Sequence, residues 1–262
     1  MGMMYFPKLN TSFIYSGLLS IALISGCDTN SSPEELEAEK VKKESAKNVP
    51  TISVAEKKAK FFGFLNPLIK KANAKVLKQR DQLLEIKEDI SDLSSAQKRT
   101  LASFVETYRV DEELSIDEQI AELEIKINKI PAALILAQAA NESAWGTSRF
   151  AKKGNNYFGQ WCFSKSCGLV PSSRNDGAAH EVAKFDSAFD SVKSYILNLN
   201  RHTAYELLRT IRQDALDNGE EVSGEALAEG LVFYSERREE YVEEIQGMIR
   251  FNKLDRFDSE QI

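Results

Sequence analysis

Glu142 is the residue of this sequence best placed for acid–base chemistry. It lies at the end of a mostly apolar stretch, residues 132–140, and shortly before Trp145. Burial among apolar side chains disfavours the charged form of a carboxyl group, so its pKa rises and it can donate a proton near neutral pH. Such a donor suits the cleavage of a glycosidic bond, in which the departing oxygen must be protonated. The same position also suits an ordinary helix-end glutamate that faces solvent, and spacing alone does not decide between the two.

The helix that carries Glu142 is predicted to lie at the centre of the fold. Pro131 suits its first turn, because the proline ring presets φ and this position needs no amide hydrogen. Gly146 is a residue type that commonly ends a helix. Small side chains on nearly every side of residues 132–140 allow close packing. We therefore expect other helices to surround this one.

Other helices are predicted before and after the central one. Two capping-box patterns mark helix starts: Ser94 with Gln97, and Ser115 with Glu118. Helical periodicity returns near Ser187, and further helices are expected over three ranges: 203–217, 223–233 and 239–254. Residues 154–186 are instead rich in turn formers, with a hairpin signal at Asp176-Gly177. The predicted fold class is mainly α, with N-terminal helices and a small β-hairpin lobe inserted after the central helix.

The stretch AQAANESAWGTSRFAKKGNNYFGQW resembles the signature of the glucosaminidase domain, glycoside hydrolase family 73. The matching residues are Glu142, Ser143, Trp145, Gly146, Ser148, Asn155, Asn156, Phe158 and Gly159. A second signature of that family, two tyrosines seven positions apart, resembles Tyr234 and Tyr241. The resemblance covers about residues 125–254. The Trp-Cys…Cys-Gly-Leu-Val-Pro segment and HEVAKF are similar to the Bax-type bacterial proteins within the family.

The resemblance implies a lysozyme-like fold, in which helices and a small β-lobe flank a cleft. It also implies that Glu142 is the catalytic acid and that Tyr234 positions the substrate or orients water. The residues expected to contact substrate are Trp145, Asn155, Asn156, Tyr157, Phe158 and Tyr241. Among these, Trp145 is expected to pack behind the acid rather than stack on a sugar, and Tyr157 suits the hairpin core equally well.

The second carboxylate of the family has no counterpart at its usual place, which falls here near residues 170–172. The nearby acids are Asp176, which looks like a turn residue, and Glu181, which we take as the candidate for the second catalytic group. If neither serves, the N-acetyl group of the substrate can act as the nucleophile, and one protein acid is then sufficient.

The reaction implied is hydrolysis of the β-1,4 bond between N-acetylglucosamine and N-acetylmuramic acid in peptidoglycan glycan strands, as by an endo-β-N-acetylglucosaminidase. No cofactor or metal is expected. A lytic transglycosylase is an alternative, but those enzymes usually carry Gly-Leu-Met-Gln where this chain has Asn-Asn-Tyr-Phe-Gly. A peptidoglycan amidase is disfavoured because such enzymes generally need zinc or a nucleophilic Cys-His pair, and the sequence has no cluster of such ligands. A non-catalytic wall-binding scaffold also remains open, given the missing second acid.

The N-terminus is predicted to direct export and lipidation. Residues 12–24 form an uncharged apolar run of signal-peptide length, and Ile24-Ser25-Gly26-Cys27 resembles a bacterial lipobox. We expect removal of residues 1–26, a lipid anchor on Cys27, and a periplasm-facing protein of a Gram-negative bacterium, with Asp28 favouring the inner membrane. An uncleaved anchor helix or a chance cysteine is the alternative. The domains expected after the signal are a flexible tether (27–55), an N-terminal helical region (56–124) and the glucosaminidase domain (125–258).

Export also bears on the cysteines and on the class of partner. In an oxidising compartment, Cys162 and Cys167, five positions apart, favour a disulfide over a metal pair. A zinc site would need two further ligands, and His180 and His202 are the only histidines. The formal net charge of −6 argues against a nucleic-acid partner, whose phosphates call for a basic surface.

Overall fold

The computed structural model describes residues 52–171 and 180–259. The described residues from Lys58 onward belong to one compact unit, whereas residues 52–57 belong to another. The predicted signal peptide, Cys27, nearly all of the tether and the Asp176-Gly177 turn lie outside the described residues.

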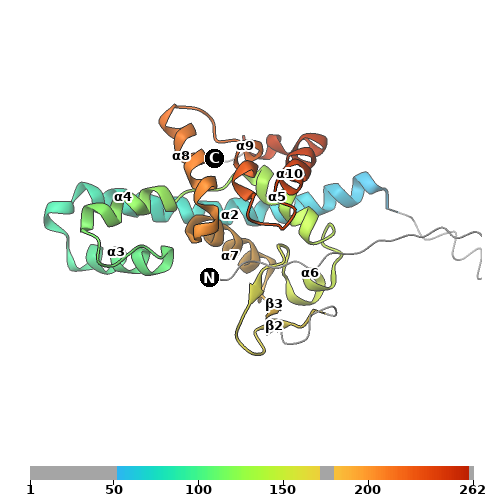
Figure 1. Ribbon diagram of the computed structural model, residues 1–262, viewed down its shortest axis with the longest axis horizontal. Coiled ribbons are helices and arrows are strands. Elements are labelled where there is room, and N and C mark those ends of the chain that lie inside the picture. The colour runs from blue at the N-terminus through green and yellow to red at the C-terminus, as the bar shows by residue number, and fades with distance from the viewer. Residues whose placement is uncertain (1–51, 172–179, 260–262) are drawn as a thin grey trace, which may run out of the picture. The chain divides into compact units, whose positions relative to one another are not determined.

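Three helices make up the N-terminal helical region: α2 (Val54–Glu88), α3 (Ser95–Tyr108) and α4 (Ile116–Lys126), with a short 3₁₀ turn η1 (Ile90–Asp92) after α2. Both predicted capping boxes are confirmed, at Ser94 for α3 and at Ser115 for α4. In Figure 1, α3 and α4 lie beside the C-terminal part of α2. The buried Tyr108 hydroxyl donates a hydrogen bond of 2.7 Å to Oε1 of Gln79, which ties α3 to α2.

The central helix α5 (Ala132–Glu142) is buried at every position from Ala132 to Ala140. It packs against α9 (Gly224–Ala228), α10 (Glu239–Asn252) and the 3₁₀ turn η4 (Leu254–Phe257). Pro131 precedes the helix and offers no side-chain cap. Instead, the Asp258 carboxylate accepts a hydrogen bond of 2.8 Å from the backbone amide of Ala133. A residue close to the C-terminus of the chain therefore caps the central helix.

The remaining helices are α6 (Arg149–Gly154), α7 (Ala188–Arg201) and α8 (Glu206–Asp217), with the 3₁₀ turns η2 (Thr203–Tyr205) and η3 (Glu229–Leu231). Arg212 of α8 is buried and donates to the carbonyl oxygens that end α4, among them that of Ile125 at 2.7 Å. One hydrophobic core runs from Phe61 of α2 to Leu254 of η4. The expected boundary between residues 124 and 125 thus falls inside α4, and the helices on both sides of it share a core.

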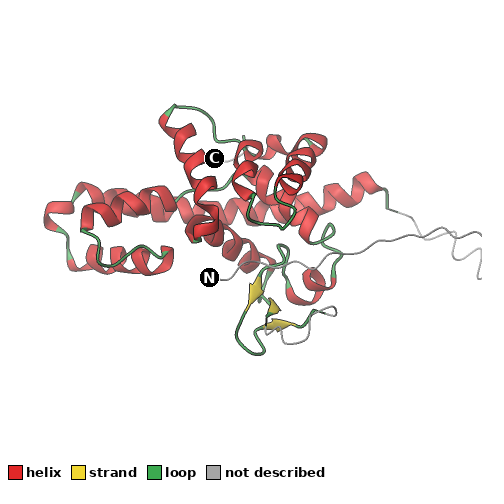
Figure 2. Cartoon of the chain, viewed as in Figure 1, coloured by secondary structure: helices red, strands yellow, loops and turns green. Residues whose placement is uncertain are grey.

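A small antiparallel sheet follows α6 in the chain. Its strands are β1 (Trp161–Cys162), β2 (Gly168–Leu169) and β3 (Glu181–Ala183), in the order β1-β3-β2. Gly168 is required where β2 meets β3, because a Cβ atom there would lie 2.0 Å from the carbonyl oxygen of Val182. Figure 2 shows these short strands as one lobe beside an otherwise helical unit. The predicted class, mainly α with a small β-lobe, is confirmed. None of the helices within the described residues has the length and hydropathy needed to cross a bilayer.

Candidate active site

Glu142 is the last residue of α5 and is partly buried. Its Oε1 atom accepts a hydrogen bond of 2.8 Å from the hydroxyl of Tyr241, on α10. Within the described part of the chain, no hydrogen bond reaches the other carboxyl oxygen, Oε2. One oxygen of the carboxyl group is therefore held by the protein, and the other is left for solvent or a ligand.

Burial raises the pKa of Glu142 from its ordinary value of 4.5 to about 7. The hydrogen bond from Tyr241 acts in the opposite direction, because it favours the charged carboxylate. Two charged side chains have smaller effects: Glu244 raises the pKa of Glu142 and Arg237 lowers it. A carboxyl group with a pKa near 7 holds a proton often enough at neutral pH to serve as a general acid.

Four buried tyrosines lie close enough to Glu142 to interact with it electrostatically: Tyr195, Tyr205, Tyr234 and Tyr241. The rings of Tyr234 and Tyr241 stack with centroids 5.3 Å apart and planes 11° apart. The Tyr234 hydroxyl donates to the carbonyl oxygen of Phe158 at 2.7 Å. The two tyrosines of the second sequence signature are thus neighbours, and Tyr241 is the one that binds the acid.

The turn after Glu142 is held in an unusual backbone conformation. Ala144, Trp145 and Gly146 all have positive φ angles, of 48°, 59° and 74°, a region that costs non-glycine residues energy. The Ser143 side chain stabilises this turn, because its Oγ donates to the carbonyl oxygen of Ala139 and accepts from the amide of Gly146. Ser143 and Gly146 of the signature therefore form the sharp turn that ends α5 directly after Glu142.

Trp145 is directed by this turn against α2. Its ring centroid lies 5.7 Å from that of Phe61 and 5.5 Å from that of Phe62, both edge-on. The ammonium group of Lys58 lies 4.7 Å from the same ring. Tyr157, also partly buried, has Phe61 and Phe64 of α2 as aromatic neighbours. The N-terminal helix thus supports the back of the signature segment.

The side chains of the two signature asparagines form hydrogen bonds with backbone groups. Asn155 adopts a left-handed conformation at the end of α6 and donates to the carbonyl oxygens of Phe185 and Asp186. Asn156 is buried; its amide donates to the carbonyl oxygens of Gln160 and Ala183, and its Oδ1 accepts from the amides of Phe158 and Gln160. These bonds fasten the loop to β3. Phe158 is buried and stacks on Tyr195 at 4.0 Å. Contact of these residues with substrate stays a prediction.

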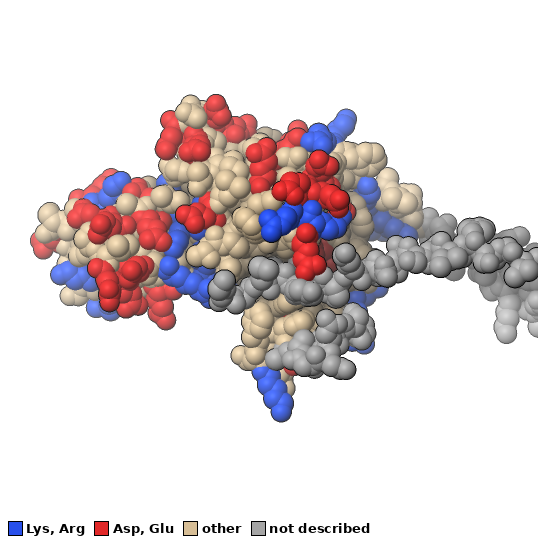
Figure 3. Space-filling view, in the orientation of Figure 1, with Lys and Arg blue, Asp and Glu red and all other residues tan. Residues whose placement is uncertain are grey.

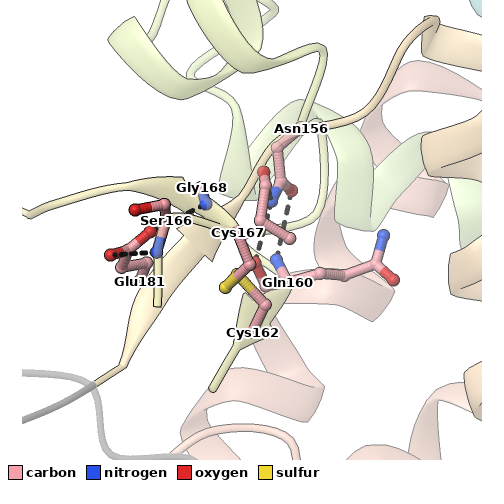
Figure 4. Close-up of a disulfide and its surroundings, with 8 residues drawn as sticks. Asn156, Gln160, Cys162, Ser166, Cys167, Gly168 and Glu181 are labelled. Atoms are coloured by element: carbon pink, nitrogen blue, oxygen red, sulfur yellow. Dashed lines mark hydrogen bonds between the residues drawn. A yellow bond between two sulfur atoms is a disulfide. The ribbon is translucent and has the colours of Figure 1, made fainter. Parts of the chain in front are cut away.

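Glu181 is engaged by the β-lobe. Its two carboxyl oxygens accept from the amides of Ser166, at 3.2 Å, and of Gly168, at 2.8 Å, as drawn in Figure 4. Cys162 and Cys167 form the predicted disulfide beside it. The two sulfur atoms and a Glu181 oxygen lie within 4.8 Å of one another. Because the sulfurs are bonded to each other, they are not thiolate ligands for a metal.

The surface near Glu142 carries a pair of opposite charges. Arg237 forms an ion pair with Glu244, and its guanidinium lies 5.8 Å from the centroid of the Tyr241 ring. Figure 3 shows acidic and basic side chains interspersed over the part of the surface where α10 lies. The two members of the pair shift the pKa of Glu142 in opposite directions, and each has a smaller effect than burial.

Sequence reasoning did not single out Gln138 and Tyr195. Gln138 is fully buried one turn before Glu142 on α5. Its Nε2 donates to the Tyr241 hydroxyl at 2.9 Å, and its Oε1 accepts from the Tyr195 hydroxyl. A signal was present in the sequence, because Gln138 is the one polar residue in the run from Ala132 to Ala140. A polar residue at such a position needs buried partners.

Comparisons with known proteins identify the family that the sequence signatures indicate. A family profile described as Glucosaminidase, mannosyl-glycoprotein endo-β-N-acetylglucosaminidase, matches residues 118–254. The chain is 28% identical to Protein bax of Escherichia coli (strain K12) over 202 residues, which cover 75% of this chain and 70% of that protein. No solved structure matches the chain. The resemblance predicted from the signatures is confirmed, and the chain belongs to the glucosaminidase family.

Proposed function

We propose that this protein is an endo-β-N-acetylglucosaminidase that cleaves peptidoglycan glycan strands with Glu142 as its general acid. The observation that carries the proposal is the carboxyl group of Glu142, whose pKa burial raises to about 7 and which presents one oxygen without a protein partner among the described residues. Membership of the glucosaminidase family supports a peptidoglycan-related glycosidase.

In the proposed reaction, neutral Glu142 donates its proton to the glycosidic oxygen as the bond from that oxygen to C1 of N-acetylglucosamine breaks. The carboxylate that forms accepts the hydrogen bond from Tyr241, which stabilises the new charge. Water then adds to C1 and loses a proton, which restores the neutral acid. The Tyr234 hydroxyl is bonded to the loop carbonyl of Phe158, so Tyr234 supports the wall of the site through its ring and this bond.

The second group of the reaction is proposed to be the N-acetyl oxygen of the substrate. Both carboxyl oxygens of Glu181 accept bonds from backbone amides of its own lobe, so this carboxylate is already engaged. Asp176 lies outside the described residues. The N-acetyl oxygen can attack C1 from the face opposite the leaving group as the glycosidic bond breaks. Water then attacks C1 from the side of Glu142, which breaks the new bond to the N-acetyl oxygen and regenerates that group, so this mechanism requires only one protein acid.

The test is digestion of purified peptidoglycan by the full chain, followed by chemical reduction of the products and mass spectrometry. We expect new reducing ends on N-acetylglucosamine, and we expect Glu142→Gln to slow their formation by roughly 10²–10⁴-fold, the usual contribution of a general acid. Glu124→Gln is the matched control, because among the described residues its carboxylate pairs with the exposed Lys87 side chain of α2 and with no group near Glu142. Anhydro-muramyl ends would instead identify a lytic transglycosylase. Binding without cleavage by the unsubstituted chain would identify a scaffold.

We also propose that the chain is a periplasm-facing lipoprotein anchored through Cys27. The support is the lipobox-like sequence ending in Cys27 and the disulfide between Cys162 and Cys167, which suits an oxidising compartment. Radiolabelled palmitate should enter the unsubstituted chain and not a Cys27→Ala variant. Equal labelling of both would contradict the anchor. Membrane fractionation would then show whether Asp28 retains the protein in the inner membrane.

A further inference from the structure

A chain of buried side chains leads from α7 to the carboxyl group of Glu142. The Tyr195 hydroxyl donates to Oε1 of Gln138, and Nε2 of Gln138 donates to the Tyr241 oxygen at 2.9 Å. The Tyr241 hydroxyl donates in turn to Oε1 of Glu142 at 2.8 Å. Gln138, Tyr195 and Tyr241 are each exposed by 2% or less. Water therefore does not compete for the two hydrogen bonds of Gln138.

The direction of this chain follows from the donors available. A tyrosine hydroxyl has one hydrogen, so Tyr241 can donate to only one partner. Because Gln138 presents its NH₂ group to the Tyr241 oxygen, that single hydrogen is left for Glu142. A reversed Gln138 amide would present its carbonyl oxygen to Tyr241 and would take the hydrogen away from Glu142. The observed amide orientation also gives the Tyr195 hydroxyl its acceptor, Oε1 of Gln138, and a reversed amide would leave the Tyr195 hydrogen to find another acceptor.

We infer that Gln138 and Tyr195 are positioning residues, which hold Tyr241 as a donor to Oε1 of Glu142 and thereby leave the acidic proton on Oε2. In a neutral carboxyl group, the oxygen that accepts a hydrogen bond is the carbonyl oxygen, and the other carries the proton. The chain thus fixes which oxygen faces the glycosidic bond, and this role rests on the proposed function of Glu142 as the acid. Bonds in such a chain also polarise one another, so each strengthens the next.

The effect of Gln138 can be separated from the charges around Glu142. The titratable and charged groups that face Glu142 are Tyr195 on α7, Tyr205 of η2, Tyr234 after η3, Tyr241 and Glu244 on α10, and Arg237 before α10. Gln138 is neutral, so its replacement alters none of these charges. A change in the titration of Glu142 after that replacement therefore reports the hydrogen-bond chain.

The test uses Gln138→Met, which keeps the side-chain length without polar atoms, and Tyr195→Phe, which keeps the ring. Tyr108→Phe is the matched control, because Tyr108 is also buried and its hydroxyl also donates to a glutamine, Gln79, but on α3 and α2. The pKa of Glu142 is measured in the full chain by NMR titration of ¹³C-labelled glutamate carboxyls, with Glu142→Gln to assign the signal. This readout needs no catalysis.

We expect the pKa of Glu142 to move above its starting value in both test variants, because a weaker donor stabilises the carboxylate less. The pKa of Glu142 in the double variant should be close to that in either single variant, because both substitutions break the same hydrogen-bond chain. With active enzyme, kcat should fall roughly tenfold, part of what a general acid supplies, and the basic limb of the pH profile should move to higher pH. Tyr108→Phe should change neither the pKa of Glu142 nor kcat.

An unchanged titration of Glu142 in both folded variants would overturn the inference, even if the unsubstituted chain cleaves peptidoglycan. A shifted titration in chains that cleave nothing would support the hydrogen-bond chain and contradict the proposed function. If Gln138→Met fails to fold, Tyr195→Phe carries the same test, because it removes one hydroxyl and leaves the ring stacked on Phe158.

Discussion

Replacing Glu142 with Gln is expected to stabilise the folded protein, and by an amount that depends on pH. Burial raises the pKa of Glu142 from 4.5 to about 7, so the folded state binds this proton more tightly than the unfolded chain does. Between these two values the folded state holds more protons, and its stability therefore falls as the pH rises. Below pH 4.5 the carboxyl group is neutral in both states and costs little. Above pH 7 it is charged in both, and the full cost is present.

The size of this cost follows from the same two values. One pH unit corresponds to about 1.36 kcal/mol, so the rise from 4.5 to about 7 corresponds to about 3 kcal/mol. This is an upper bound, because solvent reaches part of the Glu142 side chain. A glutamine has no charge to bury, and its carbonyl oxygen can still accept the hydrogen bond from Tyr241. The Glu142→Gln variant should therefore lack this loss of stability.

The measurement is urea unfolding of the full chain, followed by circular dichroism, at intervals from pH 4 to pH 9. We expect the variant and the unsubstituted chain to unfold at similar urea concentrations at pH 4. The variant should become more stable by about 1–3 kcal/mol at pH 8. Glu124→Gln, which removes a partly exposed carboxylate paired with Lys87, should show no such growth with pH. A gain in stability that is the same at every pH would refute the assignment of the raised pKa to Glu142, as would a loss of stability at pH 8.

Three further changes test the support of the site. Ser143→Ala should lower the free energy of unfolding, measured in urea, by about 1–3 kcal/mol, because the Gly146 amide and the Ala139 carbonyl lose their partner. An unchanged urea midpoint would contradict that role. Asp258→Ala should lower the free energy of unfolding by about 1 kcal/mol, because the cap of the central helix is lost. Asp258→Asn keeps an acceptor and should unfold at nearly the original temperature. Equal losses in the two variants would count against the cap. Replacing Cys162 and Cys167 with serine should lower the free energy of unfolding by about 2 kcal/mol, because the disulfide closes only a small loop. Amide hydrogen exchange in the β-lobe should become faster, and exchange as slow as before would refute this.

Much of the local structure could be predicted from the sequence, because its causes are local. The two capping boxes at Ser94 and Ser115 depend on residues three positions apart, and both helices begin there. The apolar run before Glu142 predicted a buried central helix, and the helix is buried. The turn formers between residues 154 and 186 predicted a break in helical structure, and the small sheet lies within it.

The environment of the site depended on contacts between distant segments. The cap on the central helix comes from Asp258, and the packing of Trp145 comes from Phe61 and Phe62 on α2. Glu181 was chosen as the second carboxylate from its place near the hairpin, yet in the structure its oxygens are bound by amides of the same lobe. Periodicity and spacing carry no information on such partners.

For Glu142, the sequence by itself determined that a carboxyl group ends a buried helix inside a family signature, because the apolar run and the signature are both contiguous in the chain. The tertiary structure alone decided how that carboxyl group is held. Tyr241 comes from a helix 99 positions later, and Tyr195 reaches Gln138 from 57 positions away. Burial sets the pKa of Glu142 and these hydrogen bonds choose its acidic oxygen; both arise only when α5, α7 and α10 pack together.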